Sequence, residues 1–456
     1  MSARSPSSGC LRPWPRTPRS AAAACGKAPS SCASSGGTSP SKPPGRRPGP
    51  RRKPVLDPLG ALALQVLCAA ACVSAVFTIG FSLFTVHAAG LFWRPDGRRD
   101  DAPAADPLTP ITVLKPIKGA DQGMYENLSS FLSQDHPRFQ VVFCLQDPRD
   151  PALPILRRLQ NEFPRTDLQI VISHNRIGFN PKVNNLSNAL PHIKHDLIMI
   201  SDSDVRVEPD FLRRAALPFS DPKVGLVTAF YQSRHAVGLG PALESLAVNA
   251  WFLPQAVGAV GMGMRFAMGA VMMVRRGVFE EIGGFHALSL HLADDYVLGA
   301  STQALGHRIA VLRPVVACVP DAWTIREHFE HLVRWSRTIF VCQPTGYLGS
   351  GLLHGFSLML LAALFHPSWT MLSLLALVAG VRMLSVAWIH CRYVGNREIL
   401  RHLWLLPASD LLQAAAWLGG FRSRQVVWRG QSYDICAKGR LVPSGDKPGT
   451  VPAAVL

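Results

Sequence analysis

The sequence predicts an α/β domain with a mainly parallel sheet, attached to a membrane by apolar helices before and after it. Three observations predict this class. Segments typical of strands alternate with amphipathic helices between Pro110 and about Thr345. The stretch from Leu59 to Phe92 contains no Asp, Glu, Lys or Arg. Further long apolar stretches follow Thr345, and about 20 apolar residues suffice to cross a bilayer.

The composition favours a membrane protein and argues against a nucleic-acid-binding protein. Of the 456 residues 48% are hydrophobic and only 17% are charged, which is low for a soluble protein. The net charge of +17 is concentrated in residues 1–54 and beside the apolar segments, a pattern that suits anionic lipid surfaces. No basic stretch is interleaved with aromatic residues. The ten cysteines lack zinc-site spacing and suggest no disulfide framework, which indicates a reducing compartment.

The N-terminal part of the chain divides into two segments. Residues 1–54 are rich in Ser, Pro, Ala, Gly and Arg, so we expect a disordered basic tail, or a translation start assigned too early. Residues 55–108 are expected to hold one transmembrane helix and a linker. Trp93 and Arg94 mark the expected membrane boundary, because aromatic and basic residues gather there.

Residues 109–345 are predicted to form the α/β domain. Strands are expected at "ITVLKPIKG", "FQVVFCLQD", "DLQIVIS" and "DLIMIS", separated by helices at "PALPILRRLQNEF" and "PKVNNLSNAL". Short connections between strands and helices are typical of a parallel sheet covered on both faces. In such sheets ligands bind beyond the carboxyl ends of the strands.

The region 346–440 is predicted to be membrane-associated, followed by a disordered tail over residues 441–456. Leu348–Phe365 and Trp369–Ile389 are expected to form a hairpin of spanning helices. Arg382 interrupts the second of these helices and is expected to face protein rather than lipid. A third stretch, Leu403–Phe421, has arginines on both sides, so the positive-inside rule predicts an interfacial or re-entrant segment.

A pair of aspartates follows the strand "DLIMIS". Asp202 and Asp204 stand one residue apart, and their repulsion in a partly buried crevice is costly unless a cation offsets it. Mg²⁺ or Mn²⁺ typically takes one or two carboxylates and completes its shell with phosphates and water. The pattern therefore suits a diphosphate held through a metal. The alternative is that these residues cap a helix beginning near Glu208.

Other polar residues stand at comparable positions along the domain. Asp147 follows an earlier strand, and Lys182 opens a helix. Asp294 and Asp295 begin a later helix, where the helix dipole favours carboxylates, so capping is again an alternative for Asp294. The amphipathic segment "EHFEHLVRWSRT" carries the final polar group, which is Arg334 and Trp335. Arg334 alternatively pairs with Glu330 one turn earlier, and Trp335 alternatively anchors at the membrane interface.

The ordered set formed by Asp147, the Asp-x-Asp pair, the Asp of "ADDY" and "HLVRW" resembles the D, D, D, (Q/R)xxRW series of the ceramide glucosyltransferase family, glycosyltransferase family 21. The resemblance covers roughly residues 55–440 and implies a GT-A fold with a Rossmann-like, mainly parallel sheet. "ADDYVLG" and "RFAMGA" are especially similar to bacterial members, which include a hopanoid-biosynthesis glycosyltransferase.

The resemblance implies a role for each matching residue. Asp295 would be the general base, with Asp294 beside it, and Arg334 and Trp335 would lie against the diphosphate and the acceptor. Asp202 and Asp204 would hold Mg²⁺ or Mn²⁺. The remaining positions, Asp147 and Lys182, would bind the nucleotide. His331 departs from the family pattern, where Gln or Arg is usual, which puts a direct polar contact at that position in doubt.

The implied activity is inverting transfer of glucose or N-acetylglucosamine from a UDP-sugar to a lipid hydroxyl. The acceptor would be ceramide or bacteriohopanetetrol, and the catalytic domain would lie on the cytoplasmic face of a membrane, the inner membrane in a bacterium. The alternatives are a processive polysaccharide synthase and a non-catalytic membrane scaffold with the same fold. The sugar, the lipid and the oligomeric state stay open at this point.

The apolar segment of residues 242–264 allows two interpretations. Its sequence, "ALESLAVNAWFLPQAVGAVGMGM", is compatible with a buried core segment and with an acceptor entrance lying on the membrane. The sequence favours neither.

Overall fold

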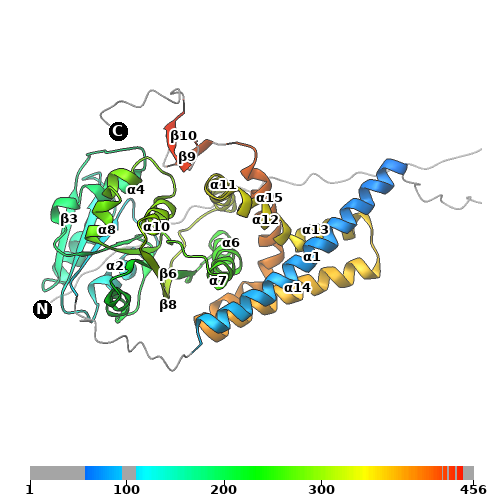
Figure 1. Cartoon of the computed structure of the whole chain (residues 1–456), viewed down its shortest axis with the longest axis horizontal. Coiled ribbons are helices and arrows are strands. Elements are labelled where there is room, and N and C mark those ends of the chain that lie inside the picture. The colour runs from blue at the N-terminus through cyan, green and yellow to red at the C-terminus, as the bar shows by residue number, and fades with distance from the viewer. Residues whose placement is uncertain (1–56, 95–108, 424, 429–430, 437–438, 445–456) are drawn as a thin grey trace, which may run out of the picture. The chain divides into compact units, whose positions relative to one another are not determined.

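The computed structural model describes residues 57–94, 109–423, 425–428, 431–436 and 439–444 (Figure 1). The predicted tail of residues 1–54, the linker after Arg94 and residues 445–456 lie outside the described residues.

The catalytic domain is built on one eight-stranded mixed sheet in the order β3-β2-β1-β4-β7-β6-β8-β5. The pairs β1–β2, β2–β3, β1–β4 and β6–β8 are parallel, whereas β7 runs antiparallel to both of its neighbours and β5 runs antiparallel to β8. The predicted α/β sheet of the GT-A type is thereby confirmed. The strands are β1 (Ile111–Pro116), β2 (Phe139–Leu145), β3 (Asp167–Ile172), β4 (Leu197–Ser201), β5 (Val205–Arg206), β6 (Val224–Ser233), β7 (Val271–Arg275) and β8 (Arg308–Cys318).

Helices cover both faces of this sheet, as the nearly continuous apolar strands require. Neighbouring strand residues point to opposite faces, so Val113 belongs to one buried core and Leu114 to the other. The first core is closed by α2 (Met124–Leu132), α3 (Leu153–Glu162) and α5 (Phe211–Ala216). The second is closed by α4 (Pro181–Ser187), α8 (Arg276–Glu281), α9 (Gly284–Leu288) and α10 (Asp294–Ala304).

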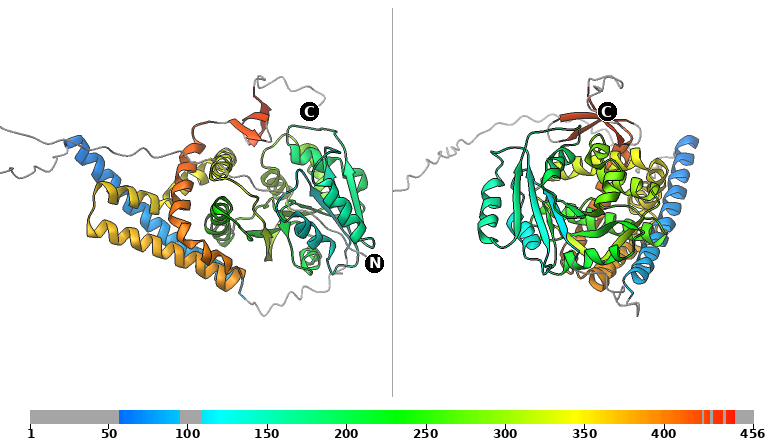
Figure 2. Two further views of the ribbon diagram at one scale, coloured as in Figure 1. Left: turned by 180° about the vertical axis from the view of Figure 1, so that it is seen from behind. Right: turned by 60° about the vertical axis from the view of Figure 1, so that its left-hand side comes forward.

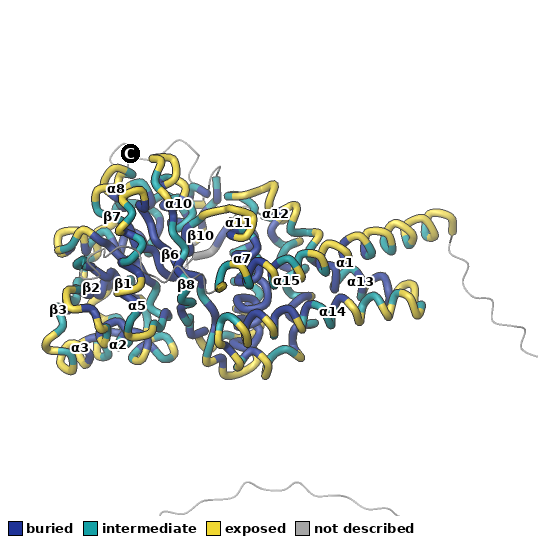
Figure 3. The backbone as a smooth tube through the Cα atoms, turned by 60° about the horizontal axis from the view of Figure 1, so that its bottom comes forward, coloured by how far each residue is buried: buried dark blue, intermediate teal, exposed yellow. Residues whose placement is uncertain are grey.

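Two helices are long and apolar enough to cross a membrane among the described residues. They are α1 (Pro58–Phe92) and α14 (Trp369–Ile389). A π-helical segment continues α14 as far as Val394. The predicted helix over 348–365 is broken into α12 (Pro344–Ser350) and α13 (Gly355–Phe365), with a bend of 48° between them. The two helices form a third candidate span only if the bent pair is counted as one span. Helices α1, α13 and α14 lie side by side (Figures 1 and 2), and their outward faces are exposed (Figure 3).

Arg382 of α14 faces protein, as predicted. Its guanidinium lies 2.7 and 2.8 Å from the two carboxylate oxygens of Asp410, and both side chains are buried. Asp410 belongs to α15 (Leu406–Gly420) and also accepts a hydrogen bond from the Trp251 indole at 2.8 Å. At 1.5 Å per residue the 15 residues of α15 extend about 22 Å, which is shorter than the hydrocarbon core of a bilayer.

The apolar segment 242–264 is largely core. It forms α6 (Leu239–Leu246), a π-helical stretch (Ala247–Phe252) and α7 (Leu253–Gly261). Helix α7 packs along α1, and α6 packs along α11 (Ile325–Cys342), so most of the segment is buried. Its end remains exposed at Met262 and Met264.

A second, three-stranded antiparallel sheet follows α15. Its strands are β9 (Gln425–Trp428), β10 (Gln431–Ile435) and β11 (Leu441–Pro443). Residues 441–443 were expected in the tail but form a strand here. The backbone N–H of Leu441 donates to the carbonyl of Leu290 at 2.7 Å, so this sheet is joined to the loop just before α10.

Candidate active site

Three separate segments of the chain bring charged side chains together at the carboxyl end of β4. Lys182 Nζ lies 2.7 Å from Asp202 Oδ1 and 3.6 Å from Asp294 Oδ2. Lys182 is near the start of α4, where Asn180 caps the helix by accepting from the backbone N–H of Lys182 and Val183. Burial by itself lowers the pKa of Lys182, but the two carboxylates outweigh burial and raise the pKa. The lysine is therefore a permanently charged bridge between the two acidic motifs.

Asp202 and Asp204 follow β4 directly and do not cap a helix. The next helix, α5, begins only at Phe211. Burial, followed by the charges of Asp202 and Asp121, raises the pKa of Asp204 to about 7. Burial and neighbouring carboxylates together therefore make a second negative charge costly at this position. The alternative that Asp202 and Asp204 cap a helix is therefore wrong.

Lys115 lies beneath the aspartate pair and was not predicted. Its Nζ donates to Ser201 Oγ at 3.0 Å and to the Asp202 carbonyl at 2.8 Å, and it lies 3.5 Å from the ring centroid of Phe131. Burial lowers the pKa of Lys115 to about 7, although Asp204 and Asp202 partly oppose that change. The signal available in the sequence was a lysine within the otherwise apolar strand "ITVLKP".

The second acidic pair begins α10. Asp294 is the first residue of the helix and faces Lys182 instead of making a side-chain cap. Burial, followed by the adjacent charge of Asp294, raises the pKa of Asp295 to about 6. Asp295 Oδ1 accepts from the Tyr296 backbone N–H at 2.8 Å. Its other oxygen lies so close to Gly269 that a Cβ there would approach it to 3.2 Å.

Asp147 lies at the same edge of the sheet but outside this cluster. It follows β2, its side chain is 54% exposed, and its Oδ1 accepts from the backbone N–H of Arg149 at 2.8 Å. That backbone hydrogen bond lowers the pKa of Asp147. Among the described residues it forms no ion pair with Lys182.

The last predicted group lies on α11. Arg334 and Trp335 are half-buried, and the Trp335 ring packs edge-on against the ring of His331 with centroids 4.7 Å apart. Glu330, the alternative partner considered for Arg334, pairs with Arg326 at 2.9 Å. The structure therefore gathers Lys182, both acidic pairs and Lys115 directly, and it places Arg334 and Trp335 on a separate helix.

A further buried charged residue, which lies near α11, was also not predicted from the sequence. Glu244 of α6 contacts His328 and His331, and its negative charge acts on Tyr231 together with those of Asp295 and Asp202. The available signal was that Glu244 is the sole charged residue in the apolar segment 242–264.

The donor set fits a hard divalent cation. No group of three or more His, Cys, Asp or Glu side chains is poised around one point in the described part of the chain. However, Asp202 and Asp204 offer carboxylate oxygens in one crevice, where burial and then the charges of Asp202 and Asp121 raise the pKa of Asp204. Mg²⁺ and Mn²⁺ need only one or two such ligands when a substrate phosphate supplies others.

Comparisons with known proteins identify the family of this chain. The model of glycosyl transferase family 21 matches residues 67–441. Ceramide glucosyltransferase 1 of Caenorhabditis elegans is 24% identical over 360 residues, covering 77% of each chain. A ceramide glucosyltransferase of Candida albicans is 34% identical over 119 residues, covering 24% of this chain and 22% of that protein.

Among solved structures, a mannosyltransferase of Pyrobaculum calidifontis in complex with GDP-Man and Mn²⁺ is 18% identical. The similarity covers 77% of this chain and 99% of that one, with a TM-score of 0.45. The family match extends over most of the described chain and includes every segment of the charged cluster. The chain therefore belongs to glycosyl transferase family 21, the membrane-associated sugar transferases that include the ceramide glucosyltransferases.

Proposed function

We propose that this enzyme moves one hexose, glucose or N-acetylglucosamine, from a UDP-sugar to the hydroxyl of a membrane lipid with inversion at the anomeric carbon. Ceramide and bacteriohopanetetrol are the proposed acceptors. The observation that carries the proposal is the meeting of Lys182, Asp202 and Asp294 within 3.6 Å, because three distant segments converge there on groups suited to a diphosphate and an acceptor.

On the donor side, Asp202 and Asp204 would hold Mg²⁺ or Mn²⁺, which when bound neutralises charge on the departing diphosphate. Lys182, whose own side chain is mostly buried, supplies a fixed positive charge beside it. Asp147, exposed at the neighbouring strand end, is proposed to bind the uracil–ribose end of the nucleotide. Arg334 is proposed to add positive charge on the opposite side of the diphosphate.

On the acceptor side, Asp295 is proposed as the general base. Its carboxylate takes the proton of the lipid hydroxyl while the hydroxyl oxygen forms a bond to the anomeric carbon. The bond from that carbon to the UDP oxygen breaks, and the electron pair leaves with UDP. Burial, followed by the charge of Asp294, raises the pKa of Asp295, and this brings the base closer to neutral pH.

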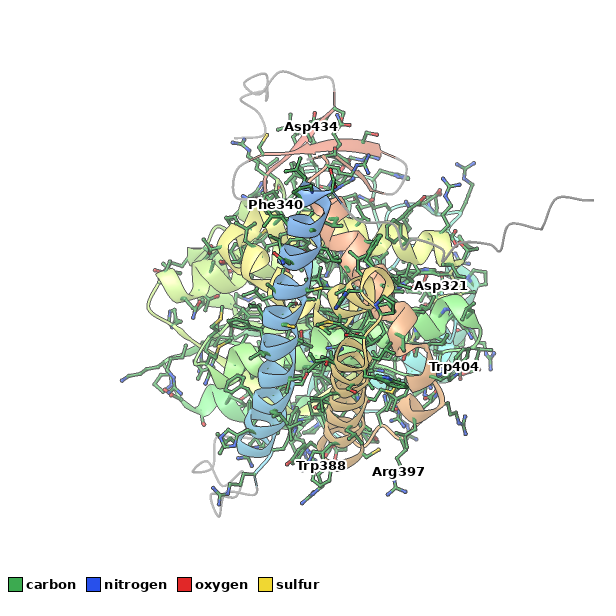
Figure 4. The ribbon with its side chains drawn as sticks, turned by 90° about the vertical axis from the view of Figure 1, so that its right-hand side faces the viewer. Asp321, Phe340, Trp388, Arg397, Trp404 and Asp434 are labelled. Atoms are coloured by element: carbon green, nitrogen blue, oxygen red, sulfur yellow. The ribbon has the colours of Figure 1, made fainter. Side chains whose placement is uncertain are left out.

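The membrane helices support a lipid acceptor and a cytoplasmic catalytic domain. Helix α14 ends near exposed Trp388, and Arg397 and Trp404 follow it on the surface (Figure 4). Exposed tryptophans followed by arginines are typical of a cytoplasmic membrane boundary. A bacterial cell would place this boundary at its inner membrane.

The test uses purified full-length protein in nanodiscs with UDP-glucose or UDP-N-acetylglucosamine and each of the two lipids. Mass spectrometry of the products is expected to show one added hexose. Asp204→Ala and Asp295→Asn should abolish the product, while Glu330→Gln, on the exposed face of α11, should retain it. Polymeric product would instead identify a polysaccharide synthase, and absence of any turnover in the unaltered protein would support a scaffold.

A further inference from the structure

Glu244 is a buried carboxylate in an apolar part of the fold. It lies on α6, is 6% exposed, and is the sole charged residue of the apolar segment 242–264. Burying a carboxylate costs several kcal/mol unless hydrogen bonds or charges compensate it. An apolar side chain at this position would avoid that cost. The compensating contacts therefore indicate what the carboxylate is for.

Both oxygens of Glu244 are directed at α11. Oε2 lies 2.8 Å from His328 Nδ1, and Oε1 lies 3.3 Å from His331 Nδ1. Burial alone would raise the pKa of Glu244, but the contacts with these two rings lower it to about 2. His328 Nδ1 shares a hydrogen bond with the Glu244 carboxylate. The Nε2 atom of His328 and the Nδ1 atom of His331 are buried without a hydrogen-bond partner among the described residues, so the contact of Glu244 with His331 is one of proximity and charge.

The two helices are also held at a close backbone distance. A Cβ at Gly240, near the start of α6, would lie 1.8 Å from the carbonyl oxygen of Trp323, just before α11. Only glycine permits this approach. The close approach at Gly240 fixes the distance between the start of α6 and the start of α11. Further along both helices, Glu244 contacts His328 and His331. With the distance fixed, this contact sets how α11 is rotated about its own axis.

His331 passes this orientation on to Trp335. Its ring lies edge-on to both Trp323 and Trp335, with centroids 4.5 and 4.7 Å apart. Arg334 and Trp335 follow His331 by three and four residues, so all three lie on one side of the helix. His331, which stands where the family motif has Gln or Arg, therefore has ring contacts of its own with Trp323 and Trp335.

A row of aromatic rings leads from Trp335 to Tyr231 of β6. Its ring centroid lies 6.3 Å from that of Phe252, and Phe252 stacks on Tyr231 at 4.3 Å. Burial raises the pKa of Tyr231, and neighbouring charges, including that of Asp295, raise it further. Displacement of Trp335 would therefore disturb the packing of Phe252 against Tyr231, a residue on which the charge of Asp295 acts.

We propose that Glu244 is a positioning residue that orients α11 through His331, and this inference rests on the proposed function. Through the ring contact of His331 with Trp335, its carboxylate keeps Trp335 at the acceptor side of the pocket. Glu244 takes no part in the chemical step, so its loss should affect acceptor use and turnover and leave donor binding nearly unchanged.

The test compares Glu244→Gln with the matched control Glu330→Gln in full-length protein in nanodiscs. For Glu244→Gln we expect kcat/KM for the lipid acceptor to fall at least tenfold, with less than a twofold change in the KM for UDP-sugar. Glu244→Asp, which keeps the charge, should recover part of the loss. Glu330→Gln should behave like the unaltered enzyme. Unchanged acceptor kinetics in Glu244→Gln would overturn the inference.

A double-mutant cycle with His331→Ala separates positioning from general damage. If Glu244 acts through His331, the double variant should be no worse than the poorer single variant. Multiplying effects would contradict that route. Should the unaltered protein transfer no sugar, the proposed function fails, and hydrogen exchange across α11 then decides the inference. Faster exchange is expected in Glu244→Gln than in Glu330→Gln, and equal exchange would refute it.

Discussion

Lys182 Nζ lies 2.7 Å from Asp202 Oδ1, so a lysine near the start of α4 is the direct counter-charge of the first aspartate of the Asp-x-Asp pair. The same ammonium group lies 3.6 Å from Asp294 Oδ2. One cation thus links the segment proposed to hold the donor with the segment that carries the proposed base.

Replacing Lys182 by Met should lower sugar transfer about 100-fold, because a fixed charge beside the diphosphate is lost. Lys182→Arg, which keeps the charge in a different geometry, should retain more activity. Lys194→Met is a suitable control, since that lysine forms only an exposed pair with Asp167. Initial rates of UDP release measure the effect. Equal rates for Lys182→Met and Lys194→Met would contradict this role.

The rate of transfer should depend on pH through Asp295, whose pKa is raised to about 6. The base acts in its ionised form, so kcat/KM should fall as the pH decreases through about 6 and reach a plateau above it. Asp294→Asn removes a neighbouring negative charge and should move this midpoint to lower pH. A pH–rate profile of both proteins measures the shift, and a midpoint that stays in place would exclude Asp294 as a cause of the raised pKa.

Removal of divalent cations with EDTA should abolish transfer, and Mn²⁺ or Mg²⁺ should restore it. Asp204→Asn leaves one carboxylate fewer, so it should raise the metal concentration needed for half-maximal rate at least tenfold. Asp210→Asn, in an exposed pair with Arg214, should need the same concentration as the unaltered enzyme. Full activity in the presence of EDTA would rule out a metal in the reaction.

The membrane region should depend on the buried pair of Arg382 and Asp410. Arg382→Met leaves the Asp410 carboxylate buried without its partner and should destabilise the protein by about 3–5 kcal/mol. The double variant Arg382→Met/Asp410→Leu should recover much of that loss, because no charge remains buried. Arg392→Met, at an exposed position, is the control. Thermal unfolding in detergent followed by tryptophan fluorescence reports the differences.

Local patterns sufficed for the strands β1 to β4 and for the place of Asp202 and Asp204 directly after β4. Strand periodicity located β1 to β4, and the rule that ligands gather beyond their carboxyl ends predicted that Asp202 lies in a crevice. The break in the helix expected over 348–365 was not predicted, because hydropathy depends only on the number of apolar residues and does not detect the bend between α12 and α13. The strands β9 to β11 were not predicted, and they form a sheet only by pairing with one another.

The sequence by itself determined the family, the α/β class, the apolar anchors and the acidic residues, because these depend on residue type, order and local spacing. Only the tertiary structure decided which of those residues meet. Lys115 and Glu244 are unremarkable in the sequence apart from their apolar surroundings, and they gain their roles from Asp202, His328 and His331 across the fold. The physical reason is that burial and electrostatic interaction depend on distances between segments that chain order does not specify.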